Sequence, residues 1–422
     1  MKTAAVIGFG CAGFCAAKAI REAEPERVID IYSDTDEAPY NPMLTTYYVS
    51  GKISESAMFP FGDLEQVRSA LGANIFCSSP VAALKARERK IVLRDGTERQ
   101  YDDIIIATGA SAVIPPIKNL PARGIYKMRT AQDARALTEA LAGQVGSALV
   151  VGAQMVGIKV VELLHRRGVK TYLADMESRM FPASAYDTTA AIIAGRLLSA
   201  GIELRLGAAV QSVVEQQGGG LLSALSDGST VASDIVIFCS GIRANLGFVD
   251  RSELDVGRGI RTDLHMRTSA EHVYAAGDCC ETTNILTGEP INLGLWANAA
   301  QQGRTAGRNA AGLDEEYQGN LIQNITHYMD TDFISVGDVK AAGERAAWSS
   351  GSGWRIEVTV ADGKMVALNI LDNANIAGPV KNIILHQAAH PSEKMTDCAK
   401  MLLTASGMPK DFIAMLGGEG ID

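Results

Sequence analysis

Short apolar runs that end in a glycine turn, each followed by a stretch of helical periodicity, recur along the chain. The first run extends from Ala4 to Ile7 and meets Gly8, and a helix-compatible stretch from Cys11 to Glu22 leads to a second run, Val28 to Tyr32. Apolar runs of this length between turn residues predict buried strands, and the longer stretch between them predicts a helix. The N-terminal part of the chain therefore predicts a βαβ unit.

A second unit of the same kind begins near Ser147, where ALVVGAQMVG leads into the helical VVELLHRRG and the strand-like KTYLAD. Between the two units, KIVLRDGTERQYDDIIIATGA predicts a hairpin with a turn at Asp95-Gly96, followed by a buried strand from Ile104 to Ala107. After Ala311, segments such as DFISVGDV and GWRIEVTVADG predict strands, and helical stretches follow. The pattern predicts an α/β fold with two Rossmann-like dinucleotide-binding domains and a C-terminal α+β domain.

Length and composition also indicate more than one folded domain. The chain has 422 residues, of which 47% are hydrophobic and 21% charged, and this length exceeds one ordinary core. Its formal net charge is −9 and no run of Lys and Arg gathers positive charge, so nucleic acid is not an expected partner. Because the chain has no apolar stretch of about 18 residues and its N-terminus enters a strand rather than a signal peptide, we expect a cytoplasmic protein without membrane insertion.

The cysteines and histidines suggest neither a metal site nor a disulfide framework. An odd number of cysteines without a CxxC pair is typical of a reducing compartment. Cys11 and Cys15 lie four residues apart on a predicted helix, a separation that rarely suits a disulfide, and Cys279 directly precedes Cys280. We interpret all four as packing residues rather than as a redox pair.

The first glycine turn has the spacing of a dinucleotide-binding motif, Gly8-Phe9-Gly10-Cys11-Ala12-Gly13. Glycines at these positions permit a tight turn, a close backbone approach to pyrophosphate and close helix packing, and the helix N-terminus then faces the phosphates. An acid after the second strand would bind ribose hydroxyls. Asp34 stands near the expected spacing, and Asp36 and Glu37 are competing candidates.

Three further segments, taken together with this glycine motif, carry a resemblance to a known family. The chain resembles the FAD/NAD(P) reductases of the pyridine nucleotide-disulfide oxidoreductase superfamily. IIIATGA, ending in Ala107-Thr108-Gly109, looks like the motif that closes the FAD domain, and VYAAGD, ending in Gly277-Asp278, looks like the flavin-binding motif. LGLWANAAQQGRTAGRNAAG resembles the helix that places Trp296 and Ala297 near the flavin edge. The FAD contacts that this resemblance implies are Gly8, Gly10, Ala12, Gly13, Asp34, Pro42, Lys52, Val81, Ala107, Thr108, Gly109, Gly277, Asp278, Trp296 and Ala297.

The resemblance also implies a domain organisation. An FAD domain at 1–112 and 241–318 is split by an inserted NAD(H)-binding domain at 113–240, and a C-terminal domain follows at 319–422. Relatives use such a last domain for dimerisation or for covering the flavin.

The second glycine turn, Gly152-Ala153-Gln154-Met155-Val156-Gly157, departs from the usual pattern. Gln154 stands where a second glycine normally lets the backbone approach the pyrophosphate, and Lys159 stands where relatives commonly carry Glu near the nicotinamide. An acid at the end of the next strand, Asp175, favours NADH over NADPH. The implied NAD contacts are Gly152, Gln154, Met155, Gly157, Asp175 and Gly241, with a βαβ scaffold that binds no nucleotide as the alternative.

The segment APYNPMLTT, from Ala38 to Thr46, holds no cysteine where disulfide reductases carry their reactive thiol. It resembles instead the matching region of rubredoxin, ferredoxin and NADH-dependent nitrite reductases, although Asn41-Pro42 departs from their basic residue. The resemblance implies flavin-centred electron transfer, without a catalytic side chain, between NAD(H) and an iron–sulfur or rubredoxin-like carrier.

The sequence leaves three assignments open. The chain is interpreted as an oligomer or as the NAD-linked flavin subunit of a larger complex, such as a 2-oxoacid:acceptor oxidoreductase. An NADH oxidase, peroxidase or coenzyme A-disulfide reductase is one alternative, and a non-catalytic flavin-binding assembly subunit is another.

Overall fold

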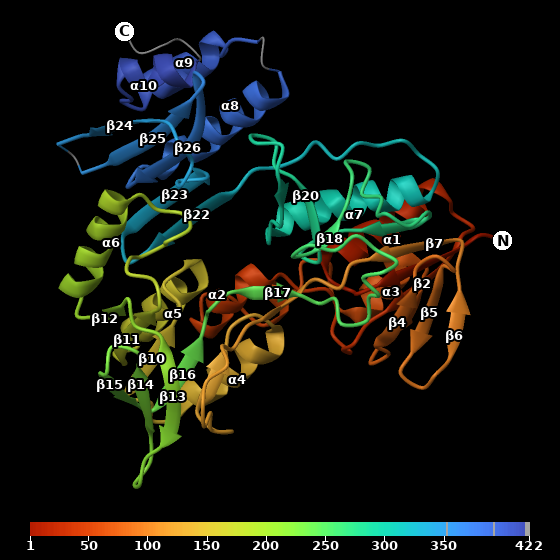
Figure 1. The fold of residues 1–422 in the computed structure, drawn as a ribbon, viewed down its shortest axis with the longest axis horizontal. Coiled ribbons are helices and arrows are strands. Elements are labelled where there is room, and N and C mark those ends of the chain that lie inside the picture. Colours follow the sequence, from red (N-terminus) through yellow and green to blue (C-terminus); the bar gives the residue numbers. More distant parts are fainter. Residues whose placement is uncertain (352, 391–392, 418–422) are drawn as a thin grey trace. The chain divides into compact units, whose positions relative to one another are not determined.

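The computed structural model describes residues 1–351, 353–390 and 393–417, which form two compact units (Figure 1). The first unit comprises Met1–Ala112, Arg129–Arg135 and Ile242–Asn320, and the second comprises Val113–Met128, Ala136–Gly241 and the residues from Leu321 onward. The chain thus leaves the first unit after Ala112, re-enters it for the segment Arg129–Arg135, and returns to it at Ile242. Helix α4 (Ala131–Ala142) has residues in both units.

The first unit is built on a parallel five-stranded sheet in the order β19-β7-β1-β2-β3. Its strands are short and apolar and most of their residues are buried, as expected for a sheet that is covered on both faces. The predicted βαβ unit is confirmed, because β1 and β2 pair in parallel on either side of α1 in the chain. These elements are β1 (Thr3–Ile7), β2 (Val28–Tyr32), β3 (Asn74–Phe76), β7 (Asp103–Ile106), β19 (Val273–Ala275) and α1 (Cys11–Ala23).

Alternate residues of β1 point to two different cores. Ala4 and Val6 pack with α1 and with α7 (Trp296–Ala310), whereas Ala5 and Ile7 pack on the side of a small antiparallel sheet, β4-β5-β6. The hairpin predicted at Asp95-Gly96 joins β5 to β6, with Gly96 at a φ of 86°. The remaining elements are η1 (Pro42–Leu44), α2 (Thr45–Val49), η2 (Ser56–Met58), α3 (Leu64–Leu71), β4 (Val81–Lys85), β5 (Lys90–Leu93), β6 (Glu98–Gln100), β8 (Ala110–Ala112), β17 (Ile242–Ala244), β18 (Ile260–Arg261), β20 (Cys280–Thr283) and β21 (Pro290–Ile291).

Helices α1 and α7 touch through their backbones. A Cβ atom at Gly303 would lie closer than 3.0 Å to the carbonyl oxygen of Ala12, and one at Gly307 would meet the carbonyl oxygen of Ala16 in the same way. Real Cβ atoms essentially never come that close. The contact therefore requires glycine on α7, and it fixes the first part of α1 against the middle and the last part of α7.

The second unit contains a parallel sheet of the same kind, in the order β12-β11-β10-β16-β9. A three-stranded antiparallel sheet, β13-β14-β15, packs beside it. The second predicted βαβ unit is confirmed, because β10 and β11 pair in parallel on either side of α5 in the chain. Its elements are β9 (Ile125–Lys127), β10 (Ser147–Val151), α5 (Met155–Arg166), β11 (Lys170–Asp175), α6 (Asp187–Ser199), β12 (Glu203–Leu206), β13 (Val210–Glu215), β14 (Leu221–Leu225), β15 (Thr230–Ser233) and β16 (Ile235–Phe238).

The C-terminal part of the second unit is an antiparallel sheet, β22-β23-β26-β25-β24, with helices at its end (Figure 1). This confirms the predicted α+β domain. Arg196 on α6 binds the carboxylate of Asp372 through two nitrogens, at 2.6 and 3.0 Å, which helps to join this sheet to the nucleotide-binding part. The elements are β22 (Gln323–Tyr328), β23 (Thr331–Gly337), β24 (Glu344–Ser349), β25 (Arg355–Ala361), β26 (Lys364–Leu371), η3 (Ala374–Ile376), α8 (Ala377–Ala389), α9 (Asp397–Ala405) and α10 (Lys410–Leu416).

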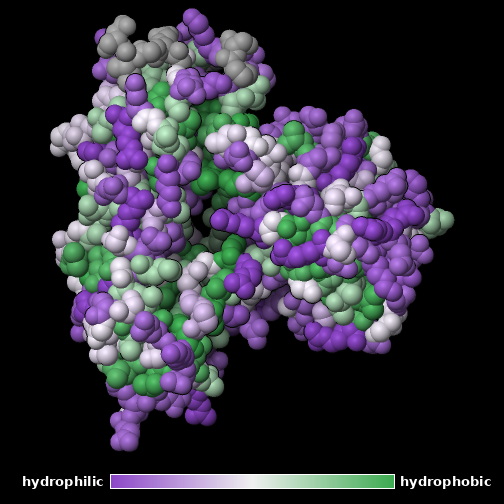
Figure 2. Space-filling view, viewed as in Figure 1, coloured by the Kyte–Doolittle hydropathy of each residue, from purple (hydrophilic) through white to green (hydrophobic). Residues whose placement is uncertain are grey.

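Hydrophilic and hydrophobic residues are interspersed over the face shown in Figure 2. In the described part of the chain, no helix is both long enough and apolar enough to cross a membrane.

Candidate functional site

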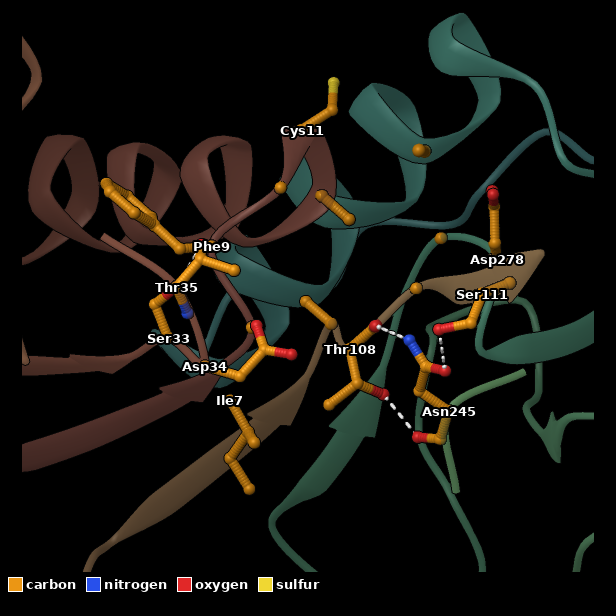
Figure 3. A pocket seen from close by; sticks show the side chains of 18 of the residues that line it. Ile7, Phe9, Cys11, Ser33, Asp34, Thr35, Thr108, Ser111, Asn245 and Asp278 are labelled. Carbon is orange, nitrogen blue, oxygen red and sulfur yellow. Dashed lines mark hydrogen bonds between the residues drawn. The ribbon is translucent and has the colours of Figure 1, made fainter. Parts of the chain in front are cut away.

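A cavity of about 570 Å³ opens in the first unit where the parallel strands end (Figure 3). Gly8 follows β1, Asp34 follows β2, Thr108 follows β7 and Asp278 follows β19, and all four line the cavity. In open α/β sheets, ligands bind outside the carboxyl ends of the strands. The cavity therefore has the position of a dinucleotide site.

The first glycine turn leaves space for a ligand at one position only. Gly8 has a φ of 104°, and a Cβ there would collide with the carbonyl of Ala107, just as a Cβ at Gly13 would collide with the carbonyl of Gly8. A Cβ at Gly10 would meet no atom within 4 Å, and Gly10 lines the cavity. Gly8 and Gly13 thus serve the packing of the protein itself, and Gly10 gives a ligand access to the backbone.

The start of α1 offers hydrogen-bond donors to that ligand. Gly10 is the residue before the helix, and no side chain caps the helix there, so the first backbone N–H groups of α1 have no partner within the helix. Such groups, with the helix dipole, bind phosphate. The cavity therefore fits the pyrophosphate of FAD.

Of the three candidate acids, Asp34 is the best placed for a ribose. Its carboxylate is exposed to solvent and lines the cavity, on the opposite side of Thr108 from Asp278 in Figure 3. Glu37 also lines the cavity, but both of its oxygens are bound by Arg135, one of them at 3.1 Å. Asp36 lies outside the lining. Of the three acids, Asp34 is therefore the one whose residue is both exposed and part of the cavity lining without an ion-pair partner in the described part of the chain.

Asp278 is paired with an arginine that sequence reasoning missed. Arg129 forms an ion pair with the Asp278 carboxylate through Nη2, and its Nε donates to the carbonyl of Ala110 at 3.3 Å. Both charged side chains are largely buried and line the cavity. Arg129 belongs to no motif and stands 149 residues before Asp278, so the sequence carries no signal for the pair.

Asn245 is a second residue that the sequence did not indicate. Its side-chain amide donates to the carbonyl of Thr108 at 2.9 Å, while the Thr108 hydroxyl donates to the carbonyl of Asn245 at 2.9 Å (Figure 3). The Ser111 hydroxyl donates to the Asn245 side-chain oxygen at 2.8 Å. These bonds hold the turn after β7 in one position at the cavity wall.

Most of the predicted FAD residues meet at the cavity. Three of them lie outside its lining. Gly13 lies beneath the turn, Lys52 is exposed with its ammonium 5.6 Å from the ring centroid of Tyr47, and Ala297 is exposed near the start of α7. The predicted residues in the lining are Gly8, Gly10, Ala12, Asp34, Pro42, Val81, Ala107, Thr108, Gly109, Gly277, Asp278 and Trp296.

Trp296 contributes an aromatic wall. Its ring stacks on Phe61 with centroids 5.6 Å apart, and Phe61 stacks on Phe14 at 4.0 Å. The Cys11 thiol donates to the Trp296 carbonyl at 3.7 Å. Phe61 and Phe14 lie outside the lining of the cavity, so of these three rings only that of Trp296 belongs to a lining residue, where an apolar surface suits the ring system of a flavin.

The second glycine turn repeats the backbone of the first. Gly152 has a φ of 119°, and a Cβ there would collide with the carbonyl of Cys239, just as a Cβ at Gly157 would collide with the carbonyl of Gly152. Met155 begins α5, and Gly241 follows β16 at a φ of 99°. Gln154 occupies the place of the open glycine.

Asp175 ends β11 and braces this turn. Its two oxygens accept hydrogen bonds from the backbone N–H groups of Ala153, at 2.6 Å, and Glu177, at 2.9 Å. A carboxylate has further lone pairs for ribose hydroxyls, and its charge repels a 2′-phosphate. Lys159, in contrast, binds Glu162 at 3.0 Å and the carbonyl of His327 on β22, so it ties α5 to the C-terminal sheet.

The cysteines next to Asp278 are packed into the core. Cys279 and Cys280 are 0% and 1% exposed, and their thiols donate to the carbonyls of Ala276 and Gly277, each at 3.3 Å. Burial raises the pKa of both thiols, and it raises the pKa of Cys239 to about 12. A neutral thiol is a poor nucleophile.

We expect iodoacetamide at mildly alkaline pH to alkylate Cys398 well before the buried cysteines. Cys398 is exposed, whereas Cys239, Cys279 and Cys280 are buried and are protonated at that pH. Peptide mass spectrometry of timed samples measures the order, with urea-unfolded protein as the control in which all cysteines react. Rapid alkylation of Cys279 or Cys280 in folded protein would contradict the packing role.

Comparison with known proteins agrees with this geometry. The family model of the pyridine nucleotide-disulphide oxidoreductases matches residues 2–303. Subunit epsilon of the NADH-dependent phenylglyoxylate dehydrogenase of Aromatoleum evansii is 30% identical over 338 residues, which are 79% of this chain and 78% of that protein. Rubredoxin-NAD(+) reductase of Alcanivorax borkumensis is 27% identical over 301 residues, 71% of this chain and 77% of that protein.

Among solved structures, the water-forming NADH oxidase from Lactobacillus brevis bound to NADH superimposes with a TM-score of 0.86 at 20% identity, over 96% of this chain and 98% of that one. This likeness confirms the predicted fold. The family match covers both glycine turns and the segments that end in Gly109 and Asp278. Members of this family are oxidoreductases that bind FAD and a pyridine nucleotide, as the sequence predicted. The chain belongs to the pyridine nucleotide-disulphide oxidoreductase family.

Proposed function

We propose that the protein is an FAD-dependent oxidoreductase that exchanges electrons between NAD(H) and a separate iron–sulfur or rubredoxin-like protein. One observation carries the proposal. The segment Ala38 to Thr46 contributes Ala38, Tyr40, Pro42 and Met43 to the cavity wall, and none of its residues is a thiol. Electrons that reach a flavin in this cavity have no thiol of that segment to pass to. Cys11 also lines the cavity, but its hydrogen bond with Cys15 and its burial raise the pKa of its thiol and keep it a poor nucleophile, which favours a separate acceptor.

The chain's own residues bind and orient the two dinucleotides in this proposal. The N–H groups at the start of α1 hold the FAD pyrophosphate, Asp34 holds its ribose, and Asp278 with Arg129 forms a polar wall of the same cavity. FAD, when bound, takes up hydride and releases electrons singly or in pairs. Asp175 accepts the ribose hydroxyls of NAD(H) at the end of β11 and disfavours NADPH.

The similarity to a dehydrogenase subunit supports a place in a larger complex. Phenylglyoxylate is a 2-oxoacid, and the related subunit epsilon belongs to an NADH-dependent enzyme for it. We extend the proposal accordingly to an NAD-linked flavin subunit whose electron partner lies on another chain of a 2-oxoacid:acceptor oxidoreductase. A cytoplasmic location is part of the proposal, since all seven cysteines are free.

The test is anaerobic stopped-flow absorbance of the flavin after mixing with NADH and, separately, NADPH. We expect NADH to bleach the flavin band and NADPH to do so at least about tenfold more slowly, a difference of ~1.4 kcal/mol. In a second experiment, the reduced protein is mixed with each oxidant in turn. We expect oxidised rubredoxin or ferredoxin to reoxidise the flavin faster than oxygen or coenzyme A disulfide does.

The outcomes separate the alternatives. Faster reoxidation by oxygen or by the disulfide would favour a small-molecule oxidase or reductase. A bound flavin that neither nucleotide bleaches would favour an assembly subunit without nucleotide-driven activity.

A further inference from the structure

The two glycine turns differ in side chain but not in backbone at their central position. Gly10 precedes α1 with φ −88° and ψ −163°, and Gln154 precedes α5 with φ −109° and ψ −172°. Both are extended conformations that any residue adopts. The Cβ of Gln154 therefore leaves the backbone in the direction that a Cβ at Gly10 would take.

A side chain that leaves the backbone in this direction enters the space before the N-terminus of the helix that follows the turn. A Cβ at Gly10 would meet no atom within 4 Å, and Gly10 lines the FAD cavity. By the equivalence of the turns, the side chain of Gln154 stands before the first N–H groups of α5, where the pyrophosphate of a dinucleotide comes closest.

The Gln154 side chain makes no hydrogen bond that would stabilise the turn in the described part of the chain. It is half-buried and does not cap α5, and within the described part of the chain its amide has no hydrogen-bond partner. Gly152 and Gly157, where a Cβ would collide with the backbone, are glycines as in the first turn. A change at 154 is therefore free to act on ligand binding without disturbing the turn.

We infer that Gln154 is an affinity-setting residue that holds the pyrophosphate of NAD(H) away from the α5 N–H groups and so weakens its binding. The inference rests on the proposed function, because it presumes that the second turn binds NAD(H). Asp175 at the end of β11 acts on the ribose, whereas Gln154 acts on the pyrophosphate that both nucleotides share, so Gln154 weakens NADH and NADPH by the same factor.

The experiment measures NAD⁺ binding to the oxidised holoprotein by isothermal titration calorimetry, since NAD⁺ cannot reduce the flavin. For Gln154→Gly we expect the Kd to fall about tenfold, as direct hydrogen bonds to the N–H groups replace the side chain. The Kd of Gln154→Ala for NAD⁺ should lie between those of Gln154→Gly and the parent protein. The limiting rate of flavin reduction by saturating NADH stays within about twofold, since no hydride-transfer contact changes.

The matched control is Gln216→Ala, the same change as Gln154→Ala at an exposed turn between β13 and β14. Its Kd for NAD⁺ should equal that of the parent. The FAD content and unfolding temperature of every protein confirm that each is folded.

The outcomes distinguish this inference from the proposed function. If the parent binds NAD⁺ and Gln154→Gly binds it equally or more weakly, Gln154 does not obstruct the site, and only this inference is overturned. If the parent neither binds NAD⁺ nor is reduced by NADH but Gln154→Gly does both, the inference is supported and the proposed function of the parent fails. If neither protein binds NAD⁺, both are overturned.

Discussion

Replacing Gly10 with glutamine is expected to give a folded protein that purifies without FAD. The first turn should tolerate glutamine at position 10, because Gln154 has nearly the backbone conformation of Gly10 at the matching position of the second turn. The new side chain would occupy the open space before α1. It would remove hydrogen bonds from backbone N–H groups to a charged phosphate, each worth roughly 1.5–3 kcal/mol. We therefore expect FAD to bind at least about a hundredfold more weakly, ~2.8 kcal/mol.

The measurement is the flavin-to-protein absorbance ratio after purification, followed by titration of the apoprotein with FAD. A matched control is Gly195→Gln, because Gly195 is exposed within α6 and a Cβ there also meets no atom within 4 Å. The control should retain FAD. Full flavin content in Gly10→Gln, with an unchanged Kd, would show that the cavity at the first turn does not hold the pyrophosphate.

The sequence predicted those parts of the fold and the site that depend on neighbouring residues. The strands β1, β2 and β11 and both glycine turns could be predicted because apolar runs and positive-φ glycines leave local patterns. Asp34 was chosen among three acids by its spacing from Gly13, and the structure places it in the cavity wall.

Partners that lie far apart in the chain could not be predicted in this way. Arg129 and Asp278 are separated by 149 residues, and Thr108 and Asn245 by 137. An ion pair or a hydrogen bond between such residues imposes no periodicity on either segment. The same holds for Lys159, whose carbonyl partner on β22 belongs to a strand 168 residues later. These contacts became visible only when the sheets had brought the segments together.

Replacing Gly303 with valine is expected to destabilise the first unit strongly. A Cβ at Gly303 would lie closer than 3.0 Å to the oxygen, carbonyl carbon and Cα of Ala12, all of which are backbone atoms of α1. Because no side-chain rotation can relieve a clash with backbone, α1 and α7 must move apart. Overpacking of a core costs typically 1–3 kcal/mol, and we expect the upper end of that range, about 3 kcal/mol.

Thermal unfolding followed by circular dichroism, with flavin fluorescence as a second probe, measures the effect. A loss of this size should lower the Tm of the unit by roughly 6–12 °C and release flavin at the lower temperature, since α1 and α7 both contribute to the cavity wall through Ala12 and Trp296. Gly195→Val is the control, because it places the same side chain in a helix with open space around it. If Gly303→Val unfolds and releases flavin at the temperatures of the control, then the backbones of α1 and α7 are not in contact at Gly303, and the close helix pair cannot be what positions the first turn against Trp296.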